Sequence, residues 1–270
     1  MRVMTRPSWE QRIARAGELA DIFPFAAEVL KFYAGVARFQ KALYGYIQQA
    51  RGRTPLAGQL FLQCLDTVLL LPRFPSFLKT VQQLGPMPLA EKAEEIAAAG
   101  EMRWEQLLRN FWHHSESAEP SYAEAFFPRA FLQPYAEYVA ERLPDPMRRG
   151  NNATCPYCES EPVVGVMREE QLGAKRGFIC SLCAHEWEFP RVMCPGCGED
   201  RNDALCVYTS EFFEHVRVDA CDTCKTYVKT VDLTKNGLAI PVVDEIASLP
   251  LTLWAEENGY SKLQPNLMAV

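Results

Sequence analysis

Cysteine is the residue type with the clearest chemistry in this chain. Eight of the ten cysteines form four C-x-x-C pairs: Cys155/Cys158, Cys180/Cys183, Cys194/Cys197 and Cys221/Cys224. Two intervening residues let a tight turn direct both sulfur atoms toward one point, and four thiolates in a tetrahedral arrangement suit Zn²⁺ or iron. The pairs therefore predict metal ligands.

The spacing groups the pairs into two sites. Residues 155–183 read C-x2-C-x21-C-x2-C and residues 194–224 read C-x2-C-x23-C-x2-C, which is typical of zinc ribbons and rubredoxins. We predict two metal ions, Zn²⁺ or iron, each bound by four cysteines. An interleaved, cross-braced ligand order is an alternative. A redox dithiol of the thioredoxin type is another, but it needs a βαβ setting and usually a single pair.

Two histidines and two cysteines fall outside this pattern. His185 and His215 could each replace a thiolate, but eight cysteines already fill two sites, so both are expected to be exposed strand residues. Cys64 and Cys206 are expected to be small buried apolar residues.

Short apolar segments between the pairs predict the hairpins that position the sulfurs. Residues 163–167 and 177–179 read as strands around a polar turn at 169–173, and residues 205–208 and 215–218 repeat this in the second copy.

The two copies resemble an internal repeat. Each closes with a C-x-x-C pair followed by a strand that carries an aromatic residue, Trp187 or Tyr227, which we expect in the hairpin core. The joint at 190–193 is short, so the copies should pack as one rigid unit. Arg191 in this joint is expected to brace the ribbons or to contact a partner.

Composition divides the chain. Residues 1–150 contain one cysteine and 18 basic against 16 acidic residues, whereas residues 151–243 contain nine cysteines and 9 basic against 14 acidic residues. The turn-rich stretch 143–152 marks the boundary. We expect a helical domain over 1–150, a first metal ribbon over 151–190, a second over 191–243, and a C-terminal helix and tail over 244–270. The fold class is therefore α+β.

Helical periodicity supports this division. Ser8 and Gln11 form a capping-box pattern ahead of the first helix. Further helical segments are expected over 29–47, 56–71 (the most fully buried), 88–112 and 121–143, with Pro128 and Pro134 kinking or dividing the last.

A C-terminal helix near 244–258 is also expected. Asp244 would cap it, and its buried stripe would be formed by Ile246, Leu249, Leu253 and Trp254.

Several function classes are disfavoured. The net charge is -6, whereas a general nucleic-acid binder is usually basic. No apolar run reaches the roughly 20 residues of a membrane span. Charged residues interrupt the N-terminal segment, so we expect no secretory signal and a cytoplasmic location. The sequence has no G-x-S-x-G, P-loop or G-x-G-x-x-G motif, so no catalytic residues are assigned and the chain is not expected to be an enzyme.

The cysteine runs and their surroundings carry a family resemblance. Residues 155–158 (CPYC), 177–183 (GFICSLC) and 221–229 (CDTCKTYVK), together with Trp187, Arg191 and the tail 257–260 (ENGY), are similar to the formate dehydrogenase accessory protein family, the FdhE type. The resemblance covers about residues 154–266 and is loose before that. One departure concerns the residue after each C-P-x-C turn, where glycine is common. Gly198 follows this pattern, whereas Glu159 and Ala184 do not.

The resemblance implies a function. Members of this family are cytoplasmic assembly factors or chaperones that engage the catalytic subunit of formate dehydrogenase before its export, and they are associated with iron as well as zinc. The first alternative is a rubredoxin-like electron-transfer protein that uses Fe(Cys)4 sites. The second is a transcription-type ribbon protein. Formation of a homodimer is possible, and the sequence does not decide the oligomeric state.

Overall fold

The structure, a computed structural model, describes residues 6–115, 122–146, 152–170 and 173–269. The chain packs as two compact units: a helical unit, Phe32–Pro146, and a sheet unit that combines Met1–Lys31 with Met147–Val270. Residues 6–31, which composition groups with the helical domain, therefore pack with the ribbons. The domain boundaries drawn from composition, near residues 150, 190 and 243, stay a proposal. Residues 147–151 of the expected linker lie outside the described residues.

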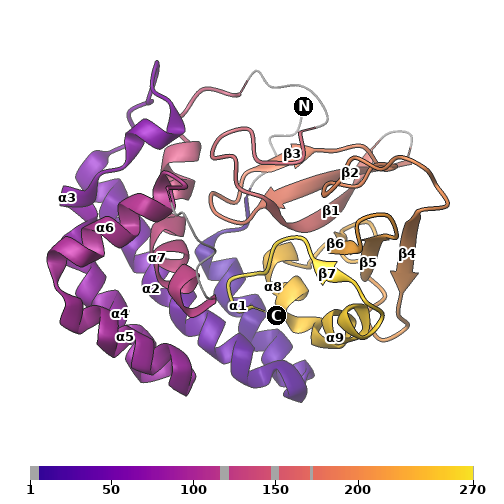
Figure 1. The fold of residues 1–270 in the computed structure, drawn as a ribbon, viewed down its shortest axis with the longest axis horizontal. Helices are drawn as coiled ribbons and strands as arrows, with labels where there is room; N and C mark the ends of the chain where they lie inside the picture. The colour runs from indigo at the N-terminus through magenta and orange to yellow at the C-terminus, as the bar shows by residue number, and fades with distance from the viewer. Residues whose placement is uncertain (1–5, 116–121, 147–151, 171–172, 270) are drawn as a thin grey trace. The chain divides into compact units, whose positions relative to one another are not determined.

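The helical unit consists of packed helices (Figure 1), and aromatic side chains fill its core. Its elements are most of α2 (Ala27–Arg51), then η2 (Phe61–Cys64), α3 (Thr67–Leu70), η3 (Leu71–Arg73), α4 (Phe74–Leu84), α5 (Met87–Ala99), α6 (Glu101–Trp112) and α7 (Tyr122–Ala140). Phe74, Phe77, Phe127 and Phe131 are fully buried. Ring contacts link them, such as the 4.9 Å between the ring centroids of Phe74 and Phe131.

Three expectations for this unit are wrong in detail. The segment 88–112 is two helices, because Gly100 adopts a φ of 81° between α5 and α6. Helix α7 runs through Pro128 and Pro134, so the expected division of this helix is wrong; burial of its aromatic face outweighs the hydrogen bonds that the prolines remove. The segment 56–71 forms only short turns of helix, and Leu60 and Val68 are 68% and 84% exposed.

In the part of the chain that the structure describes, the sheet unit contains one seven-stranded sheet (Figure 1). The first ribbon supplies β1 (Pro162–Glu170), β2 (Gly173–Cys180) and β3 (Glu186–Glu188); the second supplies β4 (Leu205–Thr209), β5 (Val216–Cys221) and β6 (Thr226–Asp232); and the tail adds β7 (Ser261–Lys262). The strand order is β3-β2-β1-β6-β5-β4, with β7 beside β6. The expected hairpins are confirmed, although residues 171–172 of the first turn are outside the described ranges.

Pairing between β1 and β6 joins the two ribbons. This pair is parallel, with Gly165 opposite Thr230 and Met167 opposite Asp232. A Cβ atom on Gly165 would lie 2.1 Å from the hydroxyl oxygen of Thr230, so glycine is required for the two strands to approach. The ribbons therefore share one backbone hydrogen-bond network, as the short joint led us to expect.

The C-terminal helical segment is two helices, α8 (Pro241–Ala247) and α9 (Leu249–Glu257). Asp244 lies inside α8 rather than at its N-cap, which is Ile240, so the expected cap is wrong. Ile246 is buried as expected, but Leu253 is 58% exposed because the break at Ser248 changes which face of the second helix is covered.

Helix α1 (Trp9–Ile22) packs against α8 in the sheet unit. The capping box of Ser8 and Gln11 is confirmed. Arg15 donates two hydrogen bonds to Asp244, at 3.0 and 2.6 Å, and the carboxylate also contacts His215 at 2.8 Å. This buried contact explains why the first helix belongs to the sheet unit.

Candidate metal centres

The first cysteine cluster is fully buried. Cys155, Cys158, Cys180 and Cys183 are each 2% exposed or less. Their sulfur atoms lie close together: Cys155 to Cys183 is 3.5 Å, Cys158 to Cys180 is 3.3 Å, and Cys158 to Cys183 is 3.7 Å. In a tetrahedral site with Zn–S bonds of about 2.3 Å, the sulfurs are roughly 3.8 Å apart. This cluster could therefore hold a metal ion.

The second cluster has similar geometry but lies partly at the surface. Cys194 and Cys224 have sulfurs 3.6 Å apart, and those of Cys197 and Cys221 are 3.7 Å apart. Cys194 and Cys221 are buried, Cys224 is partly exposed and Cys197 is exposed. All four sulfurs lie within 4.8 Å of one another, so this cluster could also hold an ion.

The clusters form from consecutive pairs, first with second and third with fourth. The interleaved order is therefore not the arrangement of this chain. All ten cysteines lie in the described residues, and none of them forms a disulfide.

Tight backbone turns hold each pair of thiols. In the first, the N–H of Glu159 donates to the carbonyl of Cys155 at 2.9 Å, and in the third, the N–H of Gly198 donates to the carbonyl of Cys194 at 3.0 Å. The residue that follows the second cysteine of each pair has a positive φ: Glu159 (62°), Ala184 (51°), Gly198 (77°) and Lys225 (57°). The non-glycine residues thus adopt the left-handed conformation that glycine adopts without strain.

Hydrogen bonds to sulfur favour thiolates over thiols. The N–H groups of Leu182 and Cys183 point at the sulfur of Cys180, at 3.3 and 3.4 Å, but burial outweighs them and raises the pKa of the Cys180 thiol. Burial alone raises a thiol pKa, and it raises that of Cys194 to about 12. At Cys224 burial acts in the same direction, but hydrogen bonds from the hydroxyl and N–H of Thr226 outweigh it and lower the pKa to about 7. Four sulfur donors in each cluster suit a soft metal ion, which would bind them as thiolates.

The residues outside the cysteine pattern differ from expectation. Neither histidine joins a cluster within the described residues. Both are partly buried and lie outside the strands, so the expectation of exposed strand residues is wrong. His185 packs on Tyr157 beside the first cluster, and His215 contacts Asp244. Cys64 and Cys206 are partly exposed rather than buried.

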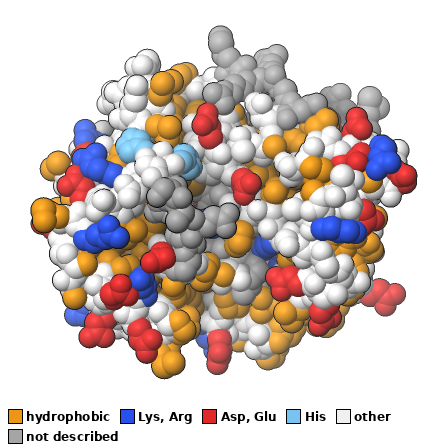
Figure 2. All heavy atoms as spheres, in the orientation of Figure 1, with side chains coloured by type: hydrophobic (Ala, Val, Ile, Leu, Met, Phe, Trp, Pro, Cys, Tyr) orange, Lys and Arg blue, Asp and Glu red, His pale blue; other side chains and the backbone are white. Residues whose placement is uncertain are grey.

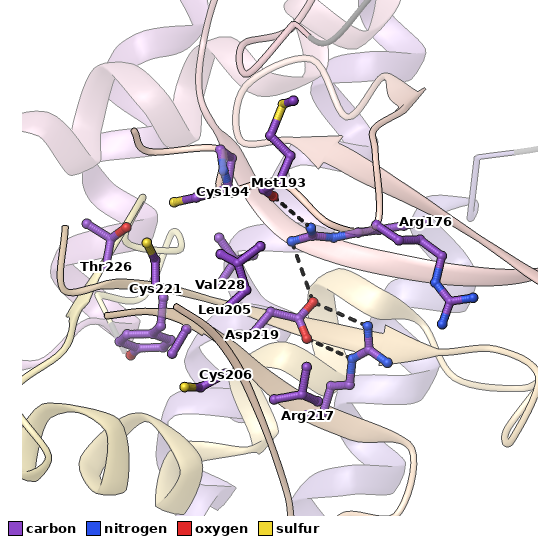
Figure 3. A pocket seen from close by; sticks show the side chains of 15 residues that line it. Arg176, Met193, Cys194, Leu205, Cys206, Arg217, Asp219, Cys221, Thr226 and Val228 are labelled. Atoms are coloured by element: carbon purple, nitrogen blue, oxygen red, sulfur yellow. Dashed lines mark hydrogen bonds and ion pairs between the residues drawn. The ribbon is translucent and has the colours of Figure 1, made fainter. Parts of the chain in front are cut away.

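Arg176 is the brace between the ribbons that sequence analysis missed (Figure 3). Its side chain leaves β2, is 4% exposed, and donates to the carbonyls of Pro190 and Met193 at 3.3 and 3.2 Å. It also pairs with Asp219 of β5 at 3.5 Å. Arg191, the residue expected in this role, is exposed beside the same shallow cavity. The sequence gives little indication of this role, because Arg176 is one charged residue in a strand where polar and apolar residues alternate.

A second buried charge cluster ties the tail to β6. Lys229 and Glu245 are 0% exposed and lie 3.0 Å apart. Asn266 donates to the other oxygen of Glu245 at 2.6 Å, and Lys262 pairs with the same carboxylate. Burial lowers the pKa of Lys229 to about 7. Trp187 and Tyr227 are buried as expected, at 7% and 1% exposed.

Comparison with known proteins places these clusters in a family. Residues 154–191 match the family model described as FdhE, central domain, and residues 192–269 match that of FdhE, C-terminal domain. The chain is 26% identical to the protein FdhE homolog of Aquifex aeolicus over 99% of this chain and 98% of that protein. It is also 26% identical to the protein FdhE homolog of Haemophilus ducreyi, covering 96% of this chain and 87% of the relative.

A solved structure has the same fold. The crystal structure of the FdhE protein from Pseudomonas aeruginosa superposes with a TM-score of 0.76 at 24% identity, covering 98% of each chain. Both family models, the full-length relatives and this shared fold agree with the motifs around the cysteine pairs. Residues 154–269 therefore carry the central and C-terminal domains of the FdhE family, and the whole chain is similar to FdhE proteins in sequence and fold.

Proposed function

We propose that this chain is an accessory protein of formate dehydrogenase. It binds the catalytic subunit of that enzyme in the cytoplasm and acts as an assembly factor or chaperone before export. The observation that carries this proposal is the pair of four-cysteine clusters within the domains that define the FdhE family. The chain serves as a binding protein, not as an enzyme.

The cluster geometry supports a binding role. A metal ion held by four cysteines has its tetrahedral positions filled by protein, which is the arrangement of structural sites. Catalytic zinc sites instead keep one position for water or substrate. We propose Cys155, Cys158, Cys180 and Cys183 as ligands of one ion, and Cys194, Cys197, Cys221 and Cys224 as ligands of the other. Either Zn²⁺ or iron suits this donor set.

Charge and surface support a protein partner. The sequence is acidic, and Figure 2 shows positive and negative side chains interspersed on the visible face. Each metal centre with four thiolates would add a charge of about -2, which disfavours nucleic acid. Within the described ranges, no helix combines the length and apolar character needed to cross a bilayer. Cysteines that bind a metal as thiolates are typical of a reducing compartment, where disulfides are disfavoured.

The test is capture of the client. Tagged full-length protein, expressed in anaerobically grown source cells, is expected to co-purify the catalytic subunit of formate dehydrogenase. Cells that lack the protein should lose most of their formate dehydrogenase activity. Cys64→Ser should capture the subunit as wild type does, because Cys64 lies in the helical unit and outside both clusters. Failure to capture the subunit, or formate oxidation by the isolated protein, would contradict the proposal.

Electron transfer is the second candidate, and one observation favours it. Cys197 is exposed, so an iron ion in the second centre would lie near the surface, as an electron-transfer site requires. The two functions separate when the chain is loaded with Zn²⁺, which has no redox chemistry. An assembly factor should restore formate dehydrogenase activity in either metal form, whereas an electron carrier should do so only with iron.

A further inference from the structure

Three arginines gather at the shallow cavity between the two ribbons. Arg176, Arg191 and Arg217 line this cavity, and they are three of only nine basic residues in the acidic region 151–243. Among the described residues that line it, Asp219 is the single carboxylate. Asp219 therefore balances one of three positive charges, and the other two have no carboxylate beside them in the lining.

The second metal centre would supply negative charge of the matching size. Two of its proposed ligands, Cys194 and Cys221, line the same cavity. Four thiolates around a divalent ion carry a net charge of about -2. Together with Asp219, a loaded centre would therefore balance the three arginines. The inference drawn from this match rests on the metal ligands proposed above.

Arg176 reaches the second centre from the first ribbon. Its side chain leaves β2 and is 4% exposed, whereas Arg191 is exposed. The guanidinium donates at 3.2 Å to the carbonyl of Met193, the residue directly before Cys194 (Figure 3). Burial lowers the pKa of Arg176, whereas the negative charges of Asp219 and Cys194 act in the opposite direction. Because water does not screen a buried cation, its interaction with nearby charge is strong.

We propose that Arg176 is the counter-charge of the second metal centre, a cation from the first ribbon that stabilises the negatively charged metal–thiolate cluster of the second. Its hydrogen bonds to the carbonyls of Pro190 and Met193 hold the guanidinium in place. Arg176 is a positioning residue and not a ligand. The coupling acts in both directions, so binding of the second ion also strengthens the joint between the ribbons.

The first test measures the metal affinity of the full-length protein by competition with a chelating dye. Arg176→Met should bind one ion about tenfold more weakly, as is usual when a residue that supports the ligands from outside is lost. Cys197→Ala should weaken the same ion, which identifies it as the second. Arg176→Lys keeps the cation and should recover part of the loss. Arg191→Met is the matched control and should bind both ions as wild type does, because solvent screens an exposed charge.

The second test separates the effect of charge from structural damage. Reduction of iron bound by four cysteines adds one negative charge, so a buried cation nearby raises the reduction potential of the centre. In a redox titration of the iron-loaded protein, Arg176→Met should shift one potential to a more negative value. Asp219→Asn removes a negative charge from the cavity and should shift the same potential to a more positive value. A role confined to bracing the ribbons predicts no such opposite shifts, because both substitutions break the same ion pair.

Unchanged affinity and potential in Arg176→Met would overturn the proposal, and so would shifts of the same sign in Arg176→Met and Asp219→Asn. If far-UV circular dichroism shows that Arg176→Met is unfolded, Arg176→Gln takes its place, since it keeps a hydrogen-bond donor and removes the charge. The number of ions in wild type separates this failure from failure of the proposed ligands. Two ions per chain that Arg176 does not affect would leave the ligands in place, whereas an empty second cluster would overturn both.

Discussion

The two ribbons differ in how deeply they hold their thiols. In the first, all four cysteines are buried, whereas in the second Cys197 is exposed and Cys224 partly so. Both clusters have nearly the same sulfur separations, and one continuous sheet carries them. Equal ligand geometry therefore does not imply equal exposure of the ligands to solvent. The first centre is suited to stabilise the fold, and the second, whose ligands reach the surface, is suited to exchange its ion with solvent.

Ligand substitution should give the largest effect and should be unequal between the centres. Cys155→Ala removes a buried ligand, and apparent binding free energies of structural zinc are about 10–16 kcal/mol. We expect this variant to lose one ion and to unfold the first ribbon. Cys197→Ala removes an exposed ligand, whose position water can occupy, so the second ion should be held more weakly while the sheet persists. Elemental analysis and far-UV circular dichroism report both outcomes.

Cys64→Ser is the control for these variants and should retain two ions. If Cys155→Ala keeps two ions and an unchanged melting temperature, the first centre is not the structural one.

The brace between the ribbons should give the next largest effect. Arg176→Met leaves two carbonyls without a donor and removes one cation from Asp219. Breaking a buried charge pair costs about 3 kcal/mol or more of unfolding free energy. Arg191→Met, at an exposed arginine beside the same cavity, should change stability by less than about 0.5 kcal/mol. Urea unfolding measures the unfolding free energy of both variants. Equal losses of unfolding free energy would show that Arg176 does not brace the ribbons.

Acid should weaken the attachment of α1 to α8. Burial raises the pKa of Asp244, but hydrogen bonds from His215 and Arg15 outweigh it, so the net shift is downward. A lowered carboxylate pKa contributes stability that is fully present above the unfolded value of about 3.9 and is lost as pH falls through the folded value. Asp244→Asn should therefore cost about 2 kcal/mol at neutral pH, as expected for hydrogen bonds to a charged group.

The difference in unfolding free energy between wild type and Asp244→Asn should shrink below about pH 4. Comparing two proteins at each pH cancels any loss of metal that both share. A difference that stays constant down to pH 2 would mean that the Asp244 charge does not stabilise the fold.

The smallest effect concerns the turn residues, and its sign should differ between the ribbons. Gly198→Ala places a side chain at a φ of 77°, where a Cβ atom meets nothing within 4 Å, so only backbone strain of about 1 kcal/mol acts. Glu159→Gly relieves that strain at the matching turn of the first ribbon, with a gain of a few tenths of a kcal/mol after the entropy of glycine is subtracted. In thermal unfolding, the melting temperature should fall for Gly198→Ala and rise slightly for Glu159→Gly. Shifts of the same sign would contradict this reading.

Local features of the fold could be predicted from sequence. The C-x-x-C spacing predicts which sulfurs meet, because a turn and a hairpin are short-range structures, and the capping box at Ser8 depends on three neighbouring positions. The pairing of β1 with β6 could not be predicted. The one indication in the sequence is Gly165 between two valines, since a glycine inside a strand can mark the close approach of another strand. Arg15 and Asp244 are 229 residues apart, and no periodicity links such distant charges. The break at Ser248 was also missed, because an apolar stripe does not show where tertiary packing interrupts a helix.

Unequal access of the two centres is tested most directly by the release of metal into excess chelator. Protein purified without chelator should contain two ions per chain. Their release, followed spectrophotometrically with a metal-binding dye, should have a fast and a slow phase of equal amplitude, and Cys197→Ala should lose or further accelerate only the fast phase. One ion or fewer per chain, or two ions released in a single phase, would contradict the account.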